Sequence, residues 1–254
     1  MYDLCWNLSH PGHIVFLIDL SESMSKKQKI EFLMDTLKDT LELLLAHAEA
    51  RERVEVSIYG YNSQIVEIWK NKKVSEMIQI FCEAEEKGNK LFYLRPEHIT
   101  CMRLAFERAK LDIEEWLSIQ KMKGYLNTPS PVVINITDGF PNEGPNFNQN
   151  NVYADTLKAA KDIMSITTSD GNVRMFNIHF DPQSEEPTLR FPANEPNSKN
   201  LQFLYNASSV MTSQMVSAAR IYGFTEIKDD SRALVSNEKD AYKLAKLLPL
   251  GTTV

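Results

Sequence analysis

Two short, strongly apolar segments, each ending at an aspartate, constrain the fold most. His13–Asp19 reads His-Ile-Val-Phe-Leu-Ile-Asp, and Val132–Asp138 reads Val-Val-Ile-Asn-Ile-Thr-Asp. Both are rich in β-branched residues and lack an alternation of apolar and polar positions, which is typical of parallel strands buried on both faces. Because parallel strands need a long crossover connection, usually a helix, the chain is predicted to alternate strands with helices.

The remaining elements follow from periodicity and from turn residues. Helices are predicted where apolar residues recur every three or four positions, at 26–51, 74–86, 99–120, 150–167, 207–222 and 238–247. Further strands are predicted at 54–59, 64–69, 173–180 and 233–235, the first two as a hairpin around 60–63. The proline-rich segment 181–200 is predicted to be an irregular surface excursion. Together they predict an α/β fold with a doubly wound, mostly parallel sheet, one antiparallel edge strand and helices on both faces.

Length and composition favour one domain and exclude several classes of protein. The 254 residues suffice for one α/β domain with a large core, so residues 1–254 are interpreted as a single domain. The net charge is -6 without any basic cluster, which argues against nucleic-acid binding. There is no signal peptide and no apolar run of about 18 residues, so a cytoplasmic protein without a membrane span is expected. The cysteines fit no zinc or disulfide framework and are interpreted as reduced thiols.

Side chains that suit a hard cation lie where the two apolar strands end. Ligands of doubly wound sheets bind at the carboxyl ends of the strands, and Asp19 and Asp138 lie there. Asp19 is followed by Ser21 and Ser23 in a loop that opens a helix, so one carboxylate and two hydroxyls fall on the same side of the loop. Such oxygens suit Mg²⁺. The alternative interpretation makes both aspartates helix N-caps without a metal.

Three loops together resemble the metal-ion-dependent adhesion site of von Willebrand factor A (VWA) domains. They carry Asp19-x-Ser21-x-Ser23, then Thr100 at the start of a helix, then Thr137-Asp138-Gly139. The resemblance covers about residues 12–180, and 181–254 are interpreted as a C-terminal strand and helices that complete the domain. Two departures are Glu22 and Glu97–Ile99, which stand where the family often has glycine and are expected to restrict movement of the loops.

The resemblance implies a Rossmann-like VWA fold and a function. It assigns hydroxyl ligands to Ser21, Ser23 and Thr100 and carboxylate roles, mostly through coordinated water, to Asp19 and Asp138. The implied cation is Mg²⁺, with Mn²⁺ or Ca²⁺ as alternatives, and one coordination position is left for an acidic side chain of a partner protein. The predicted function is therefore divalent-cation-dependent protein binding, without enzymatic activity.

A looser resemblance concerns the partner. From Asn177 to Thr252 the chain is similar to bacterial intracellular A-domain proteins, including the tellurite-resistance-associated group. Some of these are encoded near a protein kinase and a PP2C-type phosphatase, which implies a partner from such a system. Two other functions stay open. One is a metal-free scaffold. The other is a Mg²⁺-dependent phosphohydrolase of the haloacid-dehalogenase type with Asp19 as nucleophile, although Ser21 stands where that chemistry needs a second aspartate.

Other polar residues near these loops are given structural interpretations. Glu143 is interpreted as a solvated turn acid rather than a ligand, and His98 as a loop-packing residue. His179, on a strand, is interpreted as a core histidine. Lys26, Lys27 and Lys29 are interpreted as a solvated helix start.

Overall fold

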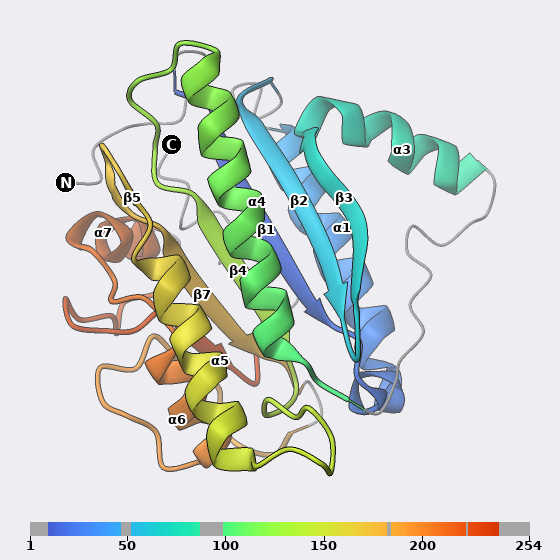
Figure 1. Cartoon of the computed structure of the whole chain (residues 1–254), viewed down its shortest axis with the longest axis vertical. Coiled ribbons are helices and arrows are strands. Elements are labelled where there is room, and N and C mark those ends of the chain that lie inside the picture. The colour runs from blue at the N-terminus through green and yellow to red at the C-terminus, as the bar shows by residue number, and fades with distance from the viewer. Residues whose placement is uncertain (1–9, 47–51, 87–98, 182–183, 222, 239–254) are drawn as a thin grey trace.

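An open, mostly parallel sheet organises the chain (Figure 1). The computed structural model describes residues 10–46, 52–86, 99–181, 184–221 and 223–238. Within these ranges one sheet has seven strands in the order β3-β2-β1-β4-β7-β9-β8. The parallel strands are β1 (Gly12–Asp19), β2 (Val54–Tyr61), β4 (Val132–Thr137), β7 (Arg174–His179) and β9 (Leu234–Ser236). Strand β3 (Ile65–Lys73) pairs antiparallel with β2, as the hairpin prediction requires.

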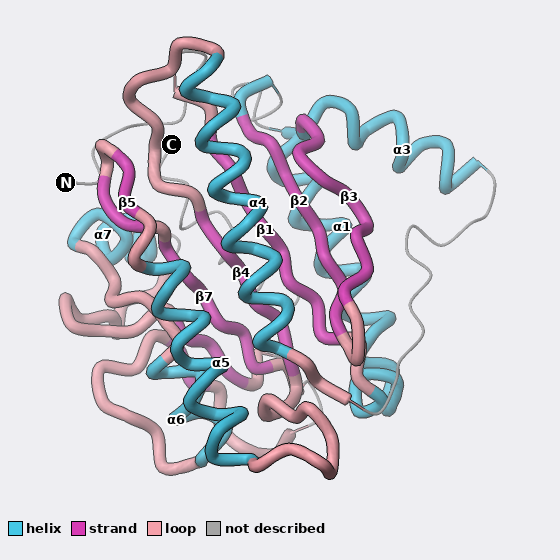
Figure 2. The backbone as a smooth tube through the Cα atoms, viewed as in Figure 1, coloured by secondary structure: helices cyan, strands magenta, loops and turns pink. Residues whose placement is uncertain are grey.

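Helices cover both faces of the sheet, as predicted (Figure 2). One face carries α1 (Lys29–Ala46), α3 (Val74–Glu86) and α7 (Ser213–Ile221). The other carries α4 (Met102–Met122), α5 (Gln149–Met164) and α6 (Lys199–Asn206). A short 3₁₀ helix, η1 (Glu22–Gln28), connects β1 to α1.

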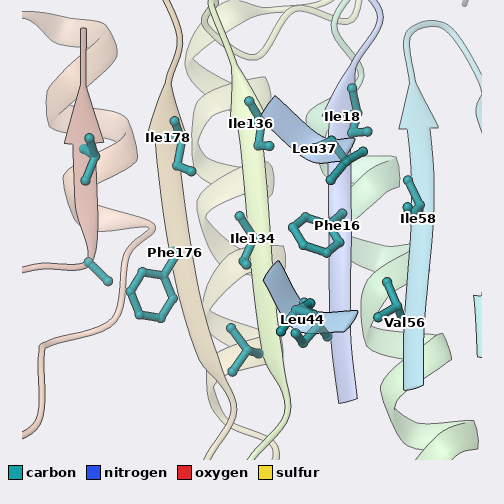
Figure 3. Packing of buried hydrophobic residues seen from close by; sticks show 14 of the residues in the cluster. Phe16, Ile18, Leu37, Leu44, Val56, Ile58, Ile134, Ile136, Phe176 and Ile178 are labelled. Atoms are coloured by element: carbon teal, nitrogen blue, oxygen red, sulfur yellow. The ribbon is translucent and has the colours of Figure 1, made fainter. Parts of the chain in front are cut away.

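Consecutive residues of the central strands enter two different cores. Phe16 and Ile18 of β1 pack against α1 residues such as Leu37 (Figure 3). Leu17 belongs instead to the core under α4. Because side chains alternate between the faces of a strand and both faces are covered, apolar residues are favoured at nearly every position of such a strand. Burial on both sides is thus the physical reason for the uninterrupted apolar runs.

The C-terminal part of the sheet differs from the prediction in two places. Within 181–200, predicted to be irregular, β8 (Leu189–Arg190) pairs antiparallel with β9, so the sheet has an antiparallel strand at each edge. The predicted helix 207–222 starts too early, because α6 ends at Asn206 and α7 (Ser213–Ile221) begins only at Ser213. The segment between them bonds to the sheet instead: Ser209 N donates to Met175 O, and Ala233 N donates to Ser209 O.

Smaller differences concern the ends of helices. Helix α5 stops at Met164, and Thr167 already belongs to a two-residue hairpin formed by β5 (Thr167–Thr168) and β6 (Gly171–Asn172). Glu238, the predicted first residue of the last helix, is not helical, and the rest of that prediction lies outside the described residues, as do residues 47–51. Within the described ranges, no helix has the length and apolar character needed to cross a membrane. The single-domain interpretation of 1–254 stays a prediction.

Candidate metal centre

The first loop of the candidate site is shaped by its own aspartate. Asp19 Oδ1 accepts a hydrogen bond of 2.8 Å from Ser21 N, which closes an Asx turn directly after β1. Leu20 N donates to Tyr61 O at the end of β2, and a Cβ at Gly60 would lie only 2.3 Å from Leu20 Cδ1. Gly60 therefore lets Leu20 approach the neighbouring strand. The hydroxyls of Ser21 and Ser23 end up 3.1 Å apart, on the same side of the loop, as the spacing predicted.

The third loop joins the first through side-chain hydrogen bonds. Since β1 and β4 are neighbours in the sheet, Asp19 and Asp138 follow adjacent strand ends. Ser23 Oγ donates to Asp138 Oδ1 over 2.6 Å, and Thr137 Oγ1 donates to Asp19 Oδ2. Gly139 N donates to Thr137 Oγ1, which fixes the turn after β4. The two carboxylates thus belong to one connected polar cluster.

The second loop brings Thr100 to the same place. Thr100 and Asn142 exchange two backbone hydrogen bonds of 2.9 and 3.0 Å, which pair the second loop with the third. A Cβ at Gly139 would lie 4.0 Å from Asp19 Oδ2, from Thr100 Oγ1 and from Thr137 Oγ1, so these three oxygens surround Gly139. The predicted site residues therefore converge. Asp19 is fully buried, Ser21 and Thr100 are nearly so, and the side chain of Asp138 is 1% exposed. His98 lies outside the described residues.

Burial gives Asp19 an unusual proton affinity. Loss of solvent raises the pKa of Asp19 from 3.8 to about 6. Hydrogen bonds from Thr137 and Ser21 oppose this rise, and the negative charge of Asp138 adds to it. The carboxylate is thus incompletely compensated by its surroundings, and a positive charge nearby would stabilise its ionised form.

Lys29 lies in this cluster, so the prediction that it belongs to a solvated helix start is wrong. Its Nζ is 2.7 Å from Asp138 Oδ2 and 3.6 Å from Asp181 Oδ1, and its side chain is only 10% exposed. Lys26, from the same predicted helix start, is exposed as expected. A sequence signal for Lys29 existed, because it precedes Leu33 by four residues and therefore lies on the apolar face of α1.

Asp181 is a second residue near the site that the sequence interpretation missed. It follows β7, the strand next to β4, so three neighbouring strands, β1, β4 and β7, each have an aspartate at or just after their carboxyl end. The signal was present in the sequence as a third strand followed by an aspartate. Asp181 was not interpreted as a site residue because it lies in the proline-rich segment that was predicted to be irregular.

The structure also tests the interpretations of Glu143 and His179. Glu143 is not a solvated turn acid, because Arg103 Nε donates to its Oε1 over 2.8 Å and its side chain is 8% exposed. This ion pair ties the third loop to the first turn of α4, close to Thr100. His179 is partly buried at the end of β7, with Nδ1 3.0 Å from Ser236 Oγ, and this burial lowers its pKa. The interpretation of His179 as a core histidine is therefore confirmed only in part.

Comparison with known proteins finds similarity in structure only. Neither a protein-family model nor a curated protein matches the sequence. Proximal thread matrix protein 1 from the mussel byssus is similar with a TM-score of 0.53 and 14% identity, over 96% of this chain and 47% of that chain. The pilus adhesin SpaC from Lactobacillus rhamnosus GG has a TM-score of 0.54 and 14% identity, over 94% of this chain and 29% of that one. What they share is the fold.

Structures of VWA domains are also among those similar to this chain. The von Willebrand factor type A structure from Catenulispora acidiphila gives a TM-score of 0.46 and 13% identity, over 68% of this chain and 35% of that chain. The present chain spans about half of the mussel protein and less than a third of SpaC. The α/β architecture expected from the resemblance is confirmed by the sheet and its two helical layers.

The donor set of the cluster suits a hard cation. It offers the carboxylates of Asp19 and Asp138 and the hydroxyls of Ser21, Ser23 and Thr100, all oxygen atoms of the kind that Mg²⁺ prefers. The ammonium of Lys29 against Asp138 shows that this position accepts positive charge. No group of three or more His, Cys, Asp or Glu side chains able to hold a metal occurs among the described residues, so a cation here would depend on hydroxyls and water as well.

Proposed function

We propose that this chain is a VWA-type module that binds one divalent cation, Mg²⁺ in the first place, and uses it to bind another protein. The observation that supports this most is convergence. Oxygens of the five residues singled out in the sequence, from three separate loops, meet at the carboxyl ends of β1 and β4. If Asp19 and Asp138 were only two unrelated helix N-caps, Thr100 would have no reason to lie beside them. Nor would Thr137 be expected to bond to Asp19, which is 118 residues away in the sequence.

Each residue has a proposed role in this site. The hydroxyls of Ser21, Ser23 and Thr100 would hold the cation directly or through water, and Asp19 and Asp138 would act mostly through coordinated water. Neutral hydroxyls would leave much of the cation's positive charge uncompensated if the carboxylates act mostly through coordinated water. The bound cation would therefore attract an anionic side chain. A glutamate or aspartate of the partner protein fits that requirement.

The proposal also extends to the setting. We propose a reducing compartment such as the bacterial cytoplasm, in which the thiols of Cys82 and Cys101 would stay reduced. The partner proposed from the looser resemblance belongs to a kinase- and phosphatase-associated system.

Partner capture tests this function. The immobilised chain is incubated with lysate of its source cell in millimolar Mg²⁺, washed, and eluted with EDTA. We expect EDTA to release the partner and the Ser21→Ala plus Ser23→Ala variant to capture none. Ser25→Ala is the matched control, because this exposed hydroxyl bonds to Glu22 O and not to the site, and it should capture normally. Capture that is undiminished in EDTA would refute cation-dependent binding.

A further inference from the structure

We infer that Lys29 is a built-in competitor of the divalent cation, holding Asp138 in the metal-free protein and passing to Asp181 when a cation binds. The inference rests on the proposed cation site and concerns how strongly that site binds. It would make the affinity of the module a property of a side chain on α1, outside the three loops.

The first step is the position of the ammonium. Both carboxylate oxygens of Asp138 already have donors, since Oδ1 accepts from Ser23 Oγ and Oδ2 accepts from Lys29 Nζ. The pair is shielded from water, because the side chain of Asp138 is only 1% exposed and that of Lys29 only 10% exposed. A cation that recruits Asp138 must therefore displace a buried, charge-assisted hydrogen bond or share the carboxylate with a second positive charge.

The second step is the presence of an alternative acceptor. Asp181 Oδ1 is buried, lies 3.6 Å from Lys29 Nζ, and has no hydrogen-bond donor within reach among the described residues. A charge-assisted bond to it would need a distance of about 2.8 Å, so the ammonium has to move by only about 1 Å. The flexible stem of lysine permits such a shift at little cost. Asp181 can thus receive the positive charge that Asp138 gives up.

The charge of Lys29 changes the affinity for the cation in a definite direction. Lys29 and a divalent cation are both positive and share Asp138, so the lysine weakens cation binding. A like charge roughly 5 Å away, at an effective dielectric constant of about 20, changes affinity by at least about tenfold. If Lys29 instead only held Asp138 in place for the cation, removing its charge would weaken binding. The two roles therefore predict opposite changes.

Calorimetric titration of the full chain with Mg²⁺ distinguishes these roles. Lys29→Met keeps most of the apolar stem and removes the charge, and it should bind Mg²⁺ at least about tenfold more tightly than wild type. Lys26→Met is the matched control, because Lys26 is exposed on η1, and its affinity should change by less than about twofold. A melting curve of each variant establishes that it is folded. Equal or weaker binding by Lys29→Met would overturn the inference while leaving the cation site intact.

The remaining outcomes of the Mg²⁺ titration also support or refute the inference. If neither wild type nor Lys29→Met binds Mg²⁺ at millimolar concentration, the cation site itself is refuted, and the competition with it. If only Lys29→Met binds, the competition is stronger than expected and the inference is supported.

A double-mutant cycle tests the role of Asp181. Asp181→Asn removes the alternative acceptor, so Lys29 should stay on Asp138 and Mg²⁺ binding should weaken. In the Lys29→Met background the same substitution removes only a nearby negative charge, and its effect should be several-fold smaller. Equal effects in both backgrounds would show that Lys29 does not pass to Asp181.

Discussion

Asp19 and Asp138 carry the same charge in very different surroundings. The hydrogen bonds to Asp19 come from a backbone N–H and from the Thr137 hydroxyl, both neutral, and burial raises its pKa to about 6. Asp138 accepts instead from the ammonium of Lys29. Ionised Asp19 therefore destabilises the metal-free fold, whereas ionised Asp138 is compensated within the protein.

Asp19→Asn should make the metal-free protein more stable at pH 7.5, on the order of 1–3 kcal/mol. Between 3.8 and about 6, folded wild type keeps a proton that the unfolded chain has released, so its stability falls as pH rises through this range. The difference between variant and wild type should accordingly shrink toward pH 4. Urea unfolding in EDTA at both pH values measures it. A variant that is less stable than wild type at pH 7.5 would contradict this description of Asp19.

Asp138→Asn should have the opposite effect in EDTA, a loss of about 1–3 kcal/mol, because the buried ammonium of Lys29 loses its nearest negative charge. Asp181, at 3.6 Å, limits the loss. The same urea titrations provide the measurement. Unchanged or increased stability would show that Lys29 does not depend on Asp138.

At the scale of elements, a buried polar network fixes α4 on the sheet. Asp112 of α4 lies 3.0 Å from His13 Nε2 of β1 and accepts a 2.9 Å hydrogen bond from Tyr59 OH of β2. The His13 ring also stacks on Trp116. Helix α4 begins at Met102, two residues after Thr100 of the second loop.

Asp112→Ala should cost about 3–5 kcal/mol, since it leaves His13 and Tyr59 buried without their shared partner. Glu115→Ala, on the same helix, removes only an exposed ion pair with Lys70 and should cost less than about 1 kcal/mol. Equilibrium unfolding in urea compares the two variants. Similar losses would mean that the network does not hold α4 in place.

The sequence predicted the elements whose structure follows from their own pattern of apolar and polar residues. The runs at β1 and β4 are apolar at nearly every position because both faces are covered, and their pairing side by side is what brings Asp19 and Asp138 together. The segment around Ser209 and strand β8 could not be predicted from local pattern, because backbone bonds to distant strands decide their conformation. Lys29 was interpreted as solvated because lysine side chains are mostly exposed in proteins. Its position on the apolar face of α1 indicated instead that its side chain is buried.

For the whole molecule, we propose binding rather than catalysis. Both oxygens of Asp19 accept hydrogen bonds, and a phosphohydrolase of the haloacid-dehalogenase type would need a second carboxylate where Ser21 stands. We expect no hydrolysis of p-nitrophenyl phosphate in millimolar Mg²⁺. Turnover that is lost in Asp19→Asn would support the phosphohydrolase alternative.

Thermal unfolding with and without Mg²⁺ tests the central claim most directly, since it needs no partner. A cation that binds only the folded state, at about 100 times its dissociation constant, stabilises by roughly 2.7 kcal/mol. For a chain of this size the melting temperature should rise by roughly 5–10 °C. Ser21→Ala plus Ser23→Ala should lose most of this rise, and Ser25→Ala should keep it. A wild-type melting temperature that does not respond to Mg²⁺, or a rise that survives in the double variant, would contradict a cation site built from these loops.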